Sequence, residues 1–121
     1  MNRKVCHNGR NNGGGKILEA CLLCLLKEKG MDYGYGLMTK LSTFGFNEEN
    51  INIGTLYRCL RKLESQKIVE SSWMDSDQGP KKRVYNITSQ GEQELENLIG
   101  FLENRRSVIE HVLNYYEKTK E

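Results

Sequence analysis

Residues 52–88 read NIGTLYRCLRKLESQKIVESSWMDSDQGPKKRVYNIT, and the pattern changes from helical to extended about halfway along. Asn52 is a favourable helix N-cap, because its side chain can accept hydrogen bonds from the free backbone N–H groups of a first turn. Leu56, Leu60 and Leu63 follow at helical spacing. The first part of the stretch therefore predicts an amphipathic helix with one buried stripe of leucines.

The face opposite the leucines is small, polar and cationic. It carries Gly54, Arg58, Arg61, Lys62 and Ser65, with Thr55 and Tyr57 at its flanks. A face of this kind suits the major groove of DNA. Two extended segments follow, residues 67–74 and 83–88, and the turn between them ends in Gly79-Pro80-Lys81-Lys82. A basic turn suits contact with phosphates or with a minor groove. A recognition helix followed by a basic hairpin predicts a winged helix-turn-helix.

Three further helices are expected around this centre. Residues 16–29 form an apolar helix that must be buried on most sides, and a second, supporting helix runs from the motif at Asp32 to about Ser42. Phe44 and Phe46 are expected to anchor the following turn in the core. The fold class is therefore mainly α with a small β-hairpin. We divide the chain into a disordered basic tail (1–15), a winged helix-turn-helix (16–88) and a C-terminal dimerisation helix (89–121).

The last helix is predicted to begin after the N-cap Thr88 and to run to about Tyr116. Such a helix spans roughly 42 Å, more than a small winged-helix body can cover. Its apolar positions recur at three- and four-residue steps and predict a homodimer contact through Leu95, Leu98, Ile99, Leu102, Ile109, Val112, Leu113 and Tyr116. The alternatives are a helix folded back on its own core and a frayed end.

Length and charge narrow the class of protein. A chain of 121 residues makes one domain with little room for a separate catalytic unit. The net charge is only +2, but residues 52–88 hold seven basic and four acidic side chains, whereas residues 89–121 hold four basic and seven acidic ones. This asymmetry favours nucleic-acid binding. No apolar run approaches a membrane span and no secretory signal opens the chain, so we expect a cytoplasmic protein without membrane contact.

Several motifs occur together in a fixed order. They are Tyr33-Gly34-Tyr35-Gly36-Leu37, then Gly54-Thr55-Leu56-Tyr57 with Leu60 and Leu63-Glu64, then Gly79-Pro80 with Arg83, Tyr85-Asn86-Ile87-Thr88 and Gly91. Over roughly residues 16–91 the chain resembles the PadR family of bacterial transcriptional regulators. The resemblance implies a dimeric winged-helix repressor that a small molecule usually releases from its operator. The lead from GYGLMTKLSTFGF into GTLYRCLRKLE also looks like the branch of polyhydroxybutyrate-responsive repressors; phenolic acids, cationic drugs and no effector at all stay open.

The predicted DNA contacts lie on the helix, the wing and the supporting helix. They are Tyr35, Thr55, Tyr57, Arg58, Arg61, Lys62, Lys81, Lys82 and Arg83. Arg58 and Arg61 are assigned to guanine, and Tyr57 and Lys62 to phosphates. The alternatives are a solvated face for the helix cations, packing for Tyr35 and a structural ion pair for Arg83. The basic tail has either a DNA contact or no role. Trp73 is more readily a packing residue than a ligand platform.

Two other functions are weighed against a DNA-binding regulator. The first is a thiol or zinc redox protein built on Cys21-x-x-Cys24, but no second ligand pair completes a tetrahedral zinc site, and cysteines in an apolar helix usually pack as small hydrophobes. We therefore predict no enzyme, no metal and no cofactor. The second is a protein-interaction adaptor of the same fold that does not bind DNA. A small effector is expected between the first helix and the partner's last helix, near Leu22, Leu98 and Leu102.

Overall fold

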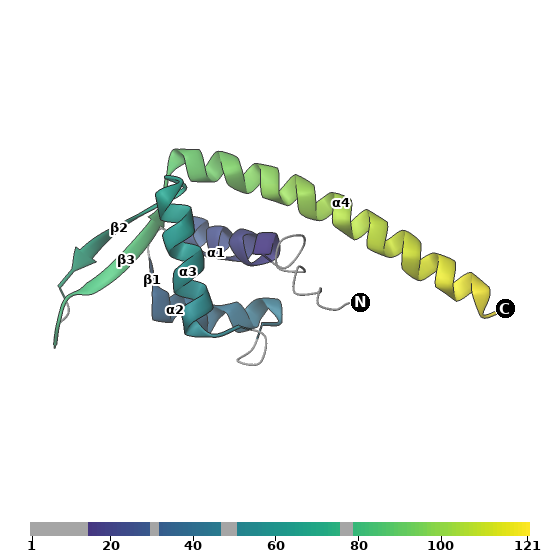
Figure 1. The fold of residues 1–121 in the computed structure, drawn as a ribbon, viewed down its shortest axis with the longest axis horizontal. Coiled ribbons are helices and arrows are strands. Elements are labelled where there is room, and N and C mark those ends of the chain that lie inside the picture. Colours follow the sequence, from purple (N-terminus) through teal and green to yellow (C-terminus); the bar gives the residue numbers. More distant parts are fainter. Residues whose placement is uncertain (1–14, 30–31, 47–50, 76–78) are drawn as a thin grey trace, which may run out of the picture.

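The computed structural model describes residues 15–29, 32–46, 51–75 and 79–121. Its elements in chain order are α1 (Gly15–Lys29), β1 (Asp32–Tyr33), α2 (Gly34–Lys40), the 3₁₀ helix η3 (Leu41–Phe44), α3 (Ile53–Ser65), β2 (Val69–Met74), β3 (Lys82–Ile87) and α4 (Ser89–Thr119). The hairpin lies beside α3 at one end of the molecule, and α4 runs from there to the opposite end (Figure 1). The predicted winged helix-turn-helix with a long last helix is confirmed. The predicted tail lies outside the described residues, except for Gly15.

The sheet contains one strand that the sequence did not predict. Asp32 and Tyr33 pair antiparallel with Tyr85 and Val84, so that the strand order is β1-β3-β2. The expected start of the second helix at Asp32 is therefore wrong, and α2 begins at Gly34. This pairing ties the start of α2 to the base of the hairpin.

The recognition helix α3 begins as predicted. The side chain of Asn52 accepts a hydrogen bond from the backbone N–H of Thr55 at 2.9 Å. Leu56, Leu60 and Leu63 are fully buried. Burying each leucine stabilises the fold by about 1.5–3 kcal/mol, so this stripe fixes the rotation of α3 about its own axis.

A tight turn carries the chain from α3 into β2. Lys67 adopts a positive φ of 64°, and the N–H of Ile68 reaches back to the carbonyl of Leu63 at 2.9 Å. This arrangement resembles the left-handed cap that commonly ends helices. Because the turn is short and hydrogen-bonded, the hairpin starts at a defined position relative to the end of α3.

The core is centred on α1, which lies beneath α3 and beside α4. Leu22, Leu23 and Leu26 have no exposed surface and belong to one cluster with leucines of α2, α3 and α4. Glu19 is the one charged residue among the buried residues that the structure describes. The predicted apolar helix is confirmed as the centre of the fold.

The helix α4 leaves the core partway along its length. Thr88 caps it by accepting from the N–H of Gly91 at 2.9 Å, as predicted, and its own hydroxyl lies 2.7 Å from the carbonyl oxygen of Lys67. A helix of 31 residues is roughly 46 Å long. Its first turns pack against α1, and its later turns extend beyond the body into solvent (Figure 1).

Two aromatic residues, Phe44 and Trp73, are more exposed than the sequence indicated. Phe46 packs against the core, whereas Phe44 is exposed at the end of η3. Trp73 is 61% exposed on β2, and its ring packs beside the Arg83 guanidinium, whose carbon lies 5.6 Å from the ring centre. Both residues lie on elements that end at the molecular surface, where alternation or spacing alone cannot identify a buried side.

Gly91 and Gly100 provide a matched pair of substitutions in α4. A Cβ at position 91 would collide with the backbone carbonyl of Ile68 and lie 2.8 Å from the Ile87 side chain, whereas at position 100 no described atom lies within 4 Å. Gly91→Ala should therefore destabilise the fold by about 1–3 kcal/mol. Gly100→Ala should stabilise it by about 0.5–1 kcal/mol through its helix propensity.

Urea denaturation of both variants at one protein concentration measures this difference. Equal unfolding midpoints for Gly91→Ala and the unsubstituted chain would contradict the close approach of α4 to the turn between α3 and β2.

Candidate nucleic-acid interface

The outward face of α3 carries two arginines that the core does not use. Arg58 and Arg61 are exposed because the buried leucines lie on the opposite side of the helix. Arg58 donates from Nη2 to the Thr55 hydroxyl at 3.1 Å, which holds its guanidinium near the N-terminal half of α3. Within the described part of the chain, neither arginine has an ion-pair partner. Both guanidinium groups are therefore free to donate hydrogen bonds to an external anion or to a base edge.

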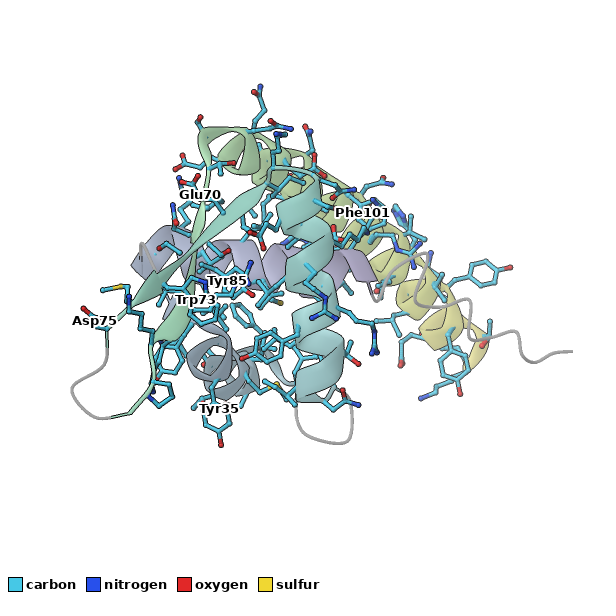
Figure 2. The ribbon with its side chains drawn as sticks, turned by 60° about the vertical axis from the view of Figure 1, so that its left-hand side comes forward. Tyr35, Glu70, Trp73, Asp75, Tyr85 and Phe101 are labelled. Carbon is cyan, nitrogen blue, oxygen red and sulfur yellow. The ribbon has the colours of Figure 1, made fainter. Side chains whose placement is uncertain are left out.

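A cleft of about 310 Å³ lies where α2, α3 and the hairpin meet, lined by Tyr33, Tyr35, Tyr57, Lys82 and Arg83. It brings together four residues predicted as DNA contacts from three separate elements. Tyr35 is 68% exposed and points away from the body at the start of α2 (Figure 2). The Lys82 ammonium lies 4.7 Å from the centre of the Tyr33 ring. Phenol hydroxyls and an ammonium group around one cleft suit a phosphate oxygen.

Close packing sets the position of the Tyr57 ring. A Cβ at Gly34 would lie 2.5 Å from the ring of Tyr57, so only glycine leaves room for the ring at the start of α2. Tyr57 is half-buried as a result. The tyrosine fixes α2 against α3 and still presents its edge to the cleft.

The wing tip holds the remaining predicted lysine. Lys81 is exposed, and its ammonium lies 3.9 Å from a carboxylate oxygen of the still more exposed Asp75. A contact of this length between exposed groups is weak. Lys81 can therefore exchange that carboxylate for a phosphate at little cost.

Lys62 has a different environment from the other predicted contacts. Its ammonium donates to the buried carboxylate of Glu19 on α1 at 2.7 Å. This hydrogen bond is the main cause that raises the pKa of Lys62, while partial burial opposes it. Lys62 thus connects α3 to α1, while its side chain remains 58% exposed one helical turn from Arg58, and its phosphate contact stays a prediction.

Arg83 also has a partner within the chain. Its Nη2 lies 3.4 Å from both carboxylate oxygens of Glu64, and its Nε donates to the Ser71 hydroxyl at 3.1 Å. The structural alternative for Arg83 is therefore present, although the ion pair joins the hairpin to α3. Sequence reasoning missed Glu64 and Glu19 as partners; the one available signal was that Glu64 is the only acidic residue of α3.

The predicted dimerisation stripe divides into two parts. Leu95 and Leu98 are buried in the chain's own core, and Ile99 and Leu102 are half-buried against it. The first two are therefore not available to a partner, because α1 already covers them. The later turns of α4 expose a continuous apolar surface formed by Val108, Ile109, Val112, Leu113, Tyr115 and Tyr116, which we call the distal stripe.

An apolar groove of about 550 Å³ lies between α1, the end of η3 and α4, lined by Ile17, Ala20, Cys21, Cys24, Phe44, Gly45, Phe46, Ile99 and Leu102. The expected effector site near Leu22 and Leu98 is wrong in those two residues, because both are fully packed in the core. Leu102 does line the groove. Its volume lies in the range of small-molecule sites in proteins.

The three described cysteines are free thiols in apolar surroundings. Burial raises the pKa of Cys59 to about 12, helped by the nearby Glu19 carboxylate. Burial and the neighbouring Cys24 raise the pKa of Cys21 to about 11. The reactive form of cysteine is the thiolate, so these shifts disfavour redox and metal chemistry. Among the described residues, no group of three or more histidine, cysteine or acidic side chains is placed to hold a metal ion.

The fold and this surface define a winged helix-turn-helix protein with a cationic reading face. The chain matches the family model described as "Transcriptional regulator PadR-like family" over residues 22–97. An uncharacterised protein of Lysinibacillus sphaericus is 33% identical over 82 residues, which are 68% of this chain and 74% of that protein.

Two solved structures extend the comparison. A PadR-like regulator of Bacillus cereus superposes with a TM-score of 0.68 at 30% identity, covering 80% of this chain and 91% of its own. The PadR protein of Bacillus subtilis in complex with operator DNA has a TM-score of 0.60 at 24% identity, covering 69% of this chain and 46% of its own.

The chain therefore belongs to the PadR-like family of transcriptional regulators. Members of this family are regulators of transcription, not enzymes, which agrees with the expectation from the sequence. None of the described helices is both long enough and apolar enough to cross a lipid bilayer.

The raised thiol pKa values can be tested by alkylation. At pH 8 the thiolate fraction of Cys21 should be roughly a hundredfold below that of an unperturbed thiol, because its pKa is about two units higher. We expect iodoacetamide to modify Cys21 and Cys59 slowly in the native chain and quickly in urea, as followed by peptide mass spectrometry. Rapid alkylation of either residue in the native chain would support the thiol-sensor alternative.

Proposed function

We propose that this protein is a dimeric, sequence-specific DNA-binding regulator that acts as a repressor and is released by a small molecule. The observation that carries the proposal is the shared surface of α3, α2 and the wing. Unpaired arginines on α3 lie on the same side as the cleft that contains Tyr35 and Lys82. The Bacillus subtilis relative in complex with operator DNA supports the same mode of use.

The helix α3 is assigned to the major groove. In helix-turn-helix proteins the N-terminal residues of the recognition helix contact base edges. Arg58 lies in that half of α3, and its bond to Thr55 orients the guanidinium before DNA arrives. A pre-oriented arginine can donate two hydrogen bonds to guanine, one to O6 and one to N7. Arg61, one turn further along, is assigned to a base or to the adjacent phosphate.

The wing and the cleft are assigned to the DNA backbone. Lys81 and Lys82 stand on the hairpin, and Tyr35 and Tyr57 offer hydroxyl donors from the two helices. Such contacts set the register of a protein on the duplex without reading its sequence. This division leaves sequence discrimination to the arginines on α3.

The distal stripe is assigned to a second copy of the chain. Its apolar residues are 51–73% exposed in the single chain. Exposed apolar surface of this extent marks an interaction site in a soluble protein. A two-fold dimer would place two copies of α3 in successive major grooves, roughly 34 Å apart. The groove at Leu102 and Ile99 lies beside α4 and is our candidate effector site, because a ligand there would alter how α4 sits on α1.

DNA binding is tested with duplexes selected from a random-sequence pool by the unsubstituted protein. Arg58→Gln and Arg61→Gln should each weaken binding to the selected duplex by about 1–3 kcal/mol, since each removes a paired contact with a base or phosphate. Fluorescence anisotropy titration gives the affinities. Lys118→Gln removes the same charge at the far end of α4 and should leave the affinity within about twofold.

Two outcomes of this experiment would contradict the proposal. Recovery of no duplex by a folded protein would favour the adaptor function over DNA binding, whereas equal affinities for Arg58→Gln and the unsubstituted chain would contradict the assignment of Arg58 to a base.

The dimer is tested at position 112. Val112→Asp places a charge in the centre of the distal stripe and should yield a monomer, because an unpaired carboxylate cannot be buried between two apolar helices. The Asn114→Asp change adds the same charge outside the stripe and should leave a dimer. Sedimentation equilibrium gives both masses. A monomeric unsubstituted chain, or a dimer of Val112→Asp, would contradict the assignment.

A further inference from the structure

Three polar side chains join the recognition helix to the hairpin. Glu64 lies in the last turn of α3, Ser71 on β2 and Arg83 on β3. The Ser71 hydroxyl donates to Glu64 Oε2 at 2.6 Å and accepts from Arg83 Nε at 3.1 Å. Arg83 Nη2 lies 3.4 Å from both oxygens of Glu64. These three residues, which we call the wing clamp, therefore form a closed ring of contacts.

The strand register explains how the wing clamp forms. Arg83 is directly opposite Trp73, and Ser71 is directly opposite Tyr85, so all four side chains lie on one face of the hairpin. Arg83 reaches diagonally across to Ser71, and its guanidinium carbon lies 5.6 Å from the centre of the Trp73 ring. Figure 2 shows Trp73 and Tyr85 on the hairpin next to α3. The guanidinium is thus held on one edge by Ser71 and Glu64 and on its face by Trp73.

The charges of the wing clamp cancel. Glu64 is the only acidic residue of α3, and Arg83 is its ion-pair partner at 3.4 Å. A phosphate that bound Arg83 would have to replace Glu64 and leave that carboxylate unpaired near the DNA. Lys82 comes next to Arg83 and points to the other face of the strand, toward Tyr33. The geometry thus separates a lysine that can meet phosphate from an arginine that is already engaged.

We propose that Glu64 and Arg83 are positioning residues that set the angle of the wing against the recognition helix, while the wing contacts DNA through Lys81 and Lys82. This inference rests on the proposed DNA-binding function. It replaces the assignment of Arg83 as a DNA contact. The wing clamp acts on affinity indirectly, because a wing at the wrong angle cannot reach the backbone while α3 occupies the groove.

The test uses substitutions that neutralise either partner and measures the affinity for the selected duplex over a range of salt concentrations. Glu64→Gln and Arg83→Gln should each weaken binding on the order of tenfold, because either change breaks the same charge-assisted contact. The double substitution should be no weaker than the single ones. All three should also lower the slope of the salt dependence, because a misplaced wing loses the phosphate contacts of Lys81 and Lys82, whereas Lys82→Gln alone should lower it by about 0.9, the value for one lost phosphate contact.

A direct phosphate contact by Arg83 predicts the opposite pattern. Glu64→Gln would then tighten binding by removing a repulsive charge and would leave the salt slope unchanged, and only Arg83→Gln would lower the slope. Arg83→Lys separates the two cases again. A lysine keeps the charge for phosphate, but it cannot hold Ser71 and Glu64 together with a planar fork. We expect Arg83→Lys to bind as weakly as Arg83→Gln; retention of full affinity would overturn the proposal.

The fluorescence of Trp73 tests the wing clamp in the absence of DNA. Trp73 is the single tryptophan of the chain, and it lies against the Arg83 guanidinium. Glu64→Gln and Arg83→Gln should shift its fluorescence emission in the same direction, whereas Lys82→Gln should leave it unchanged. An unchanged emission in both wing-clamp variants would overturn the inference even if the proposed DNA binding is correct. If the protein selects no duplex, the emission shift alone decides whether the wing clamp exists.

Discussion

The burial of one leucine stripe on α3 is the constraint on which the rest of the structure depends. Leu56, Leu60 and Leu63 have no exposed surface, so rotating the helix would expose all three together. At about 1.5–3 kcal/mol per side chain, such a rotation would cost much of the stability of a domain this size. The arginines on the opposite face are therefore aimed outward by apolar packing. Their own charges contribute little to that orientation.

Two polar links then position other elements relative to α3. Lys62 joins it to the buried Glu19 of α1, and Glu64 joins it to the hairpin through Arg83. One link thus points toward the core helix that lines the apolar groove, and the other toward the wing. Under the proposed effector control, these packed and hydrogen-bonded groups are the contacts by which a ligand on α1 would act on the reading surface.

The sequence predicted the features that depend on neighbouring residues. The caps at Asn52 and Thr88 and the leucine spacing of α3 are local, and the structure confirms them. Lys62 and Glu19 are 43 positions apart, and Arg83 and Glu64 are 19 apart, so no local pattern reveals either pair. Strand β1 has only two residues, and it exists because β3 supplies its partners. The same limit applies to the apolar stripe of α4. Its spacing is regular throughout, so the sequence does not show that Leu95 and Leu98 are buried in the chain's own core while the later residues are exposed.

Hydroxyl-radical footprinting on the promoter DNA of the protein's own gene would show whether a two-fold dimer binds DNA through α3 and the wing. A dimer that reads DNA with α3 should leave two protected blocks related by a two-fold axis, with centres about one helical turn apart, roughly 34 Å. Protection of the backbone should flank each block, where the wings lie. A single unsymmetrical block, or protection spread evenly along the fragment, would contradict a dimer that reads DNA with α3 and positions itself with the wing.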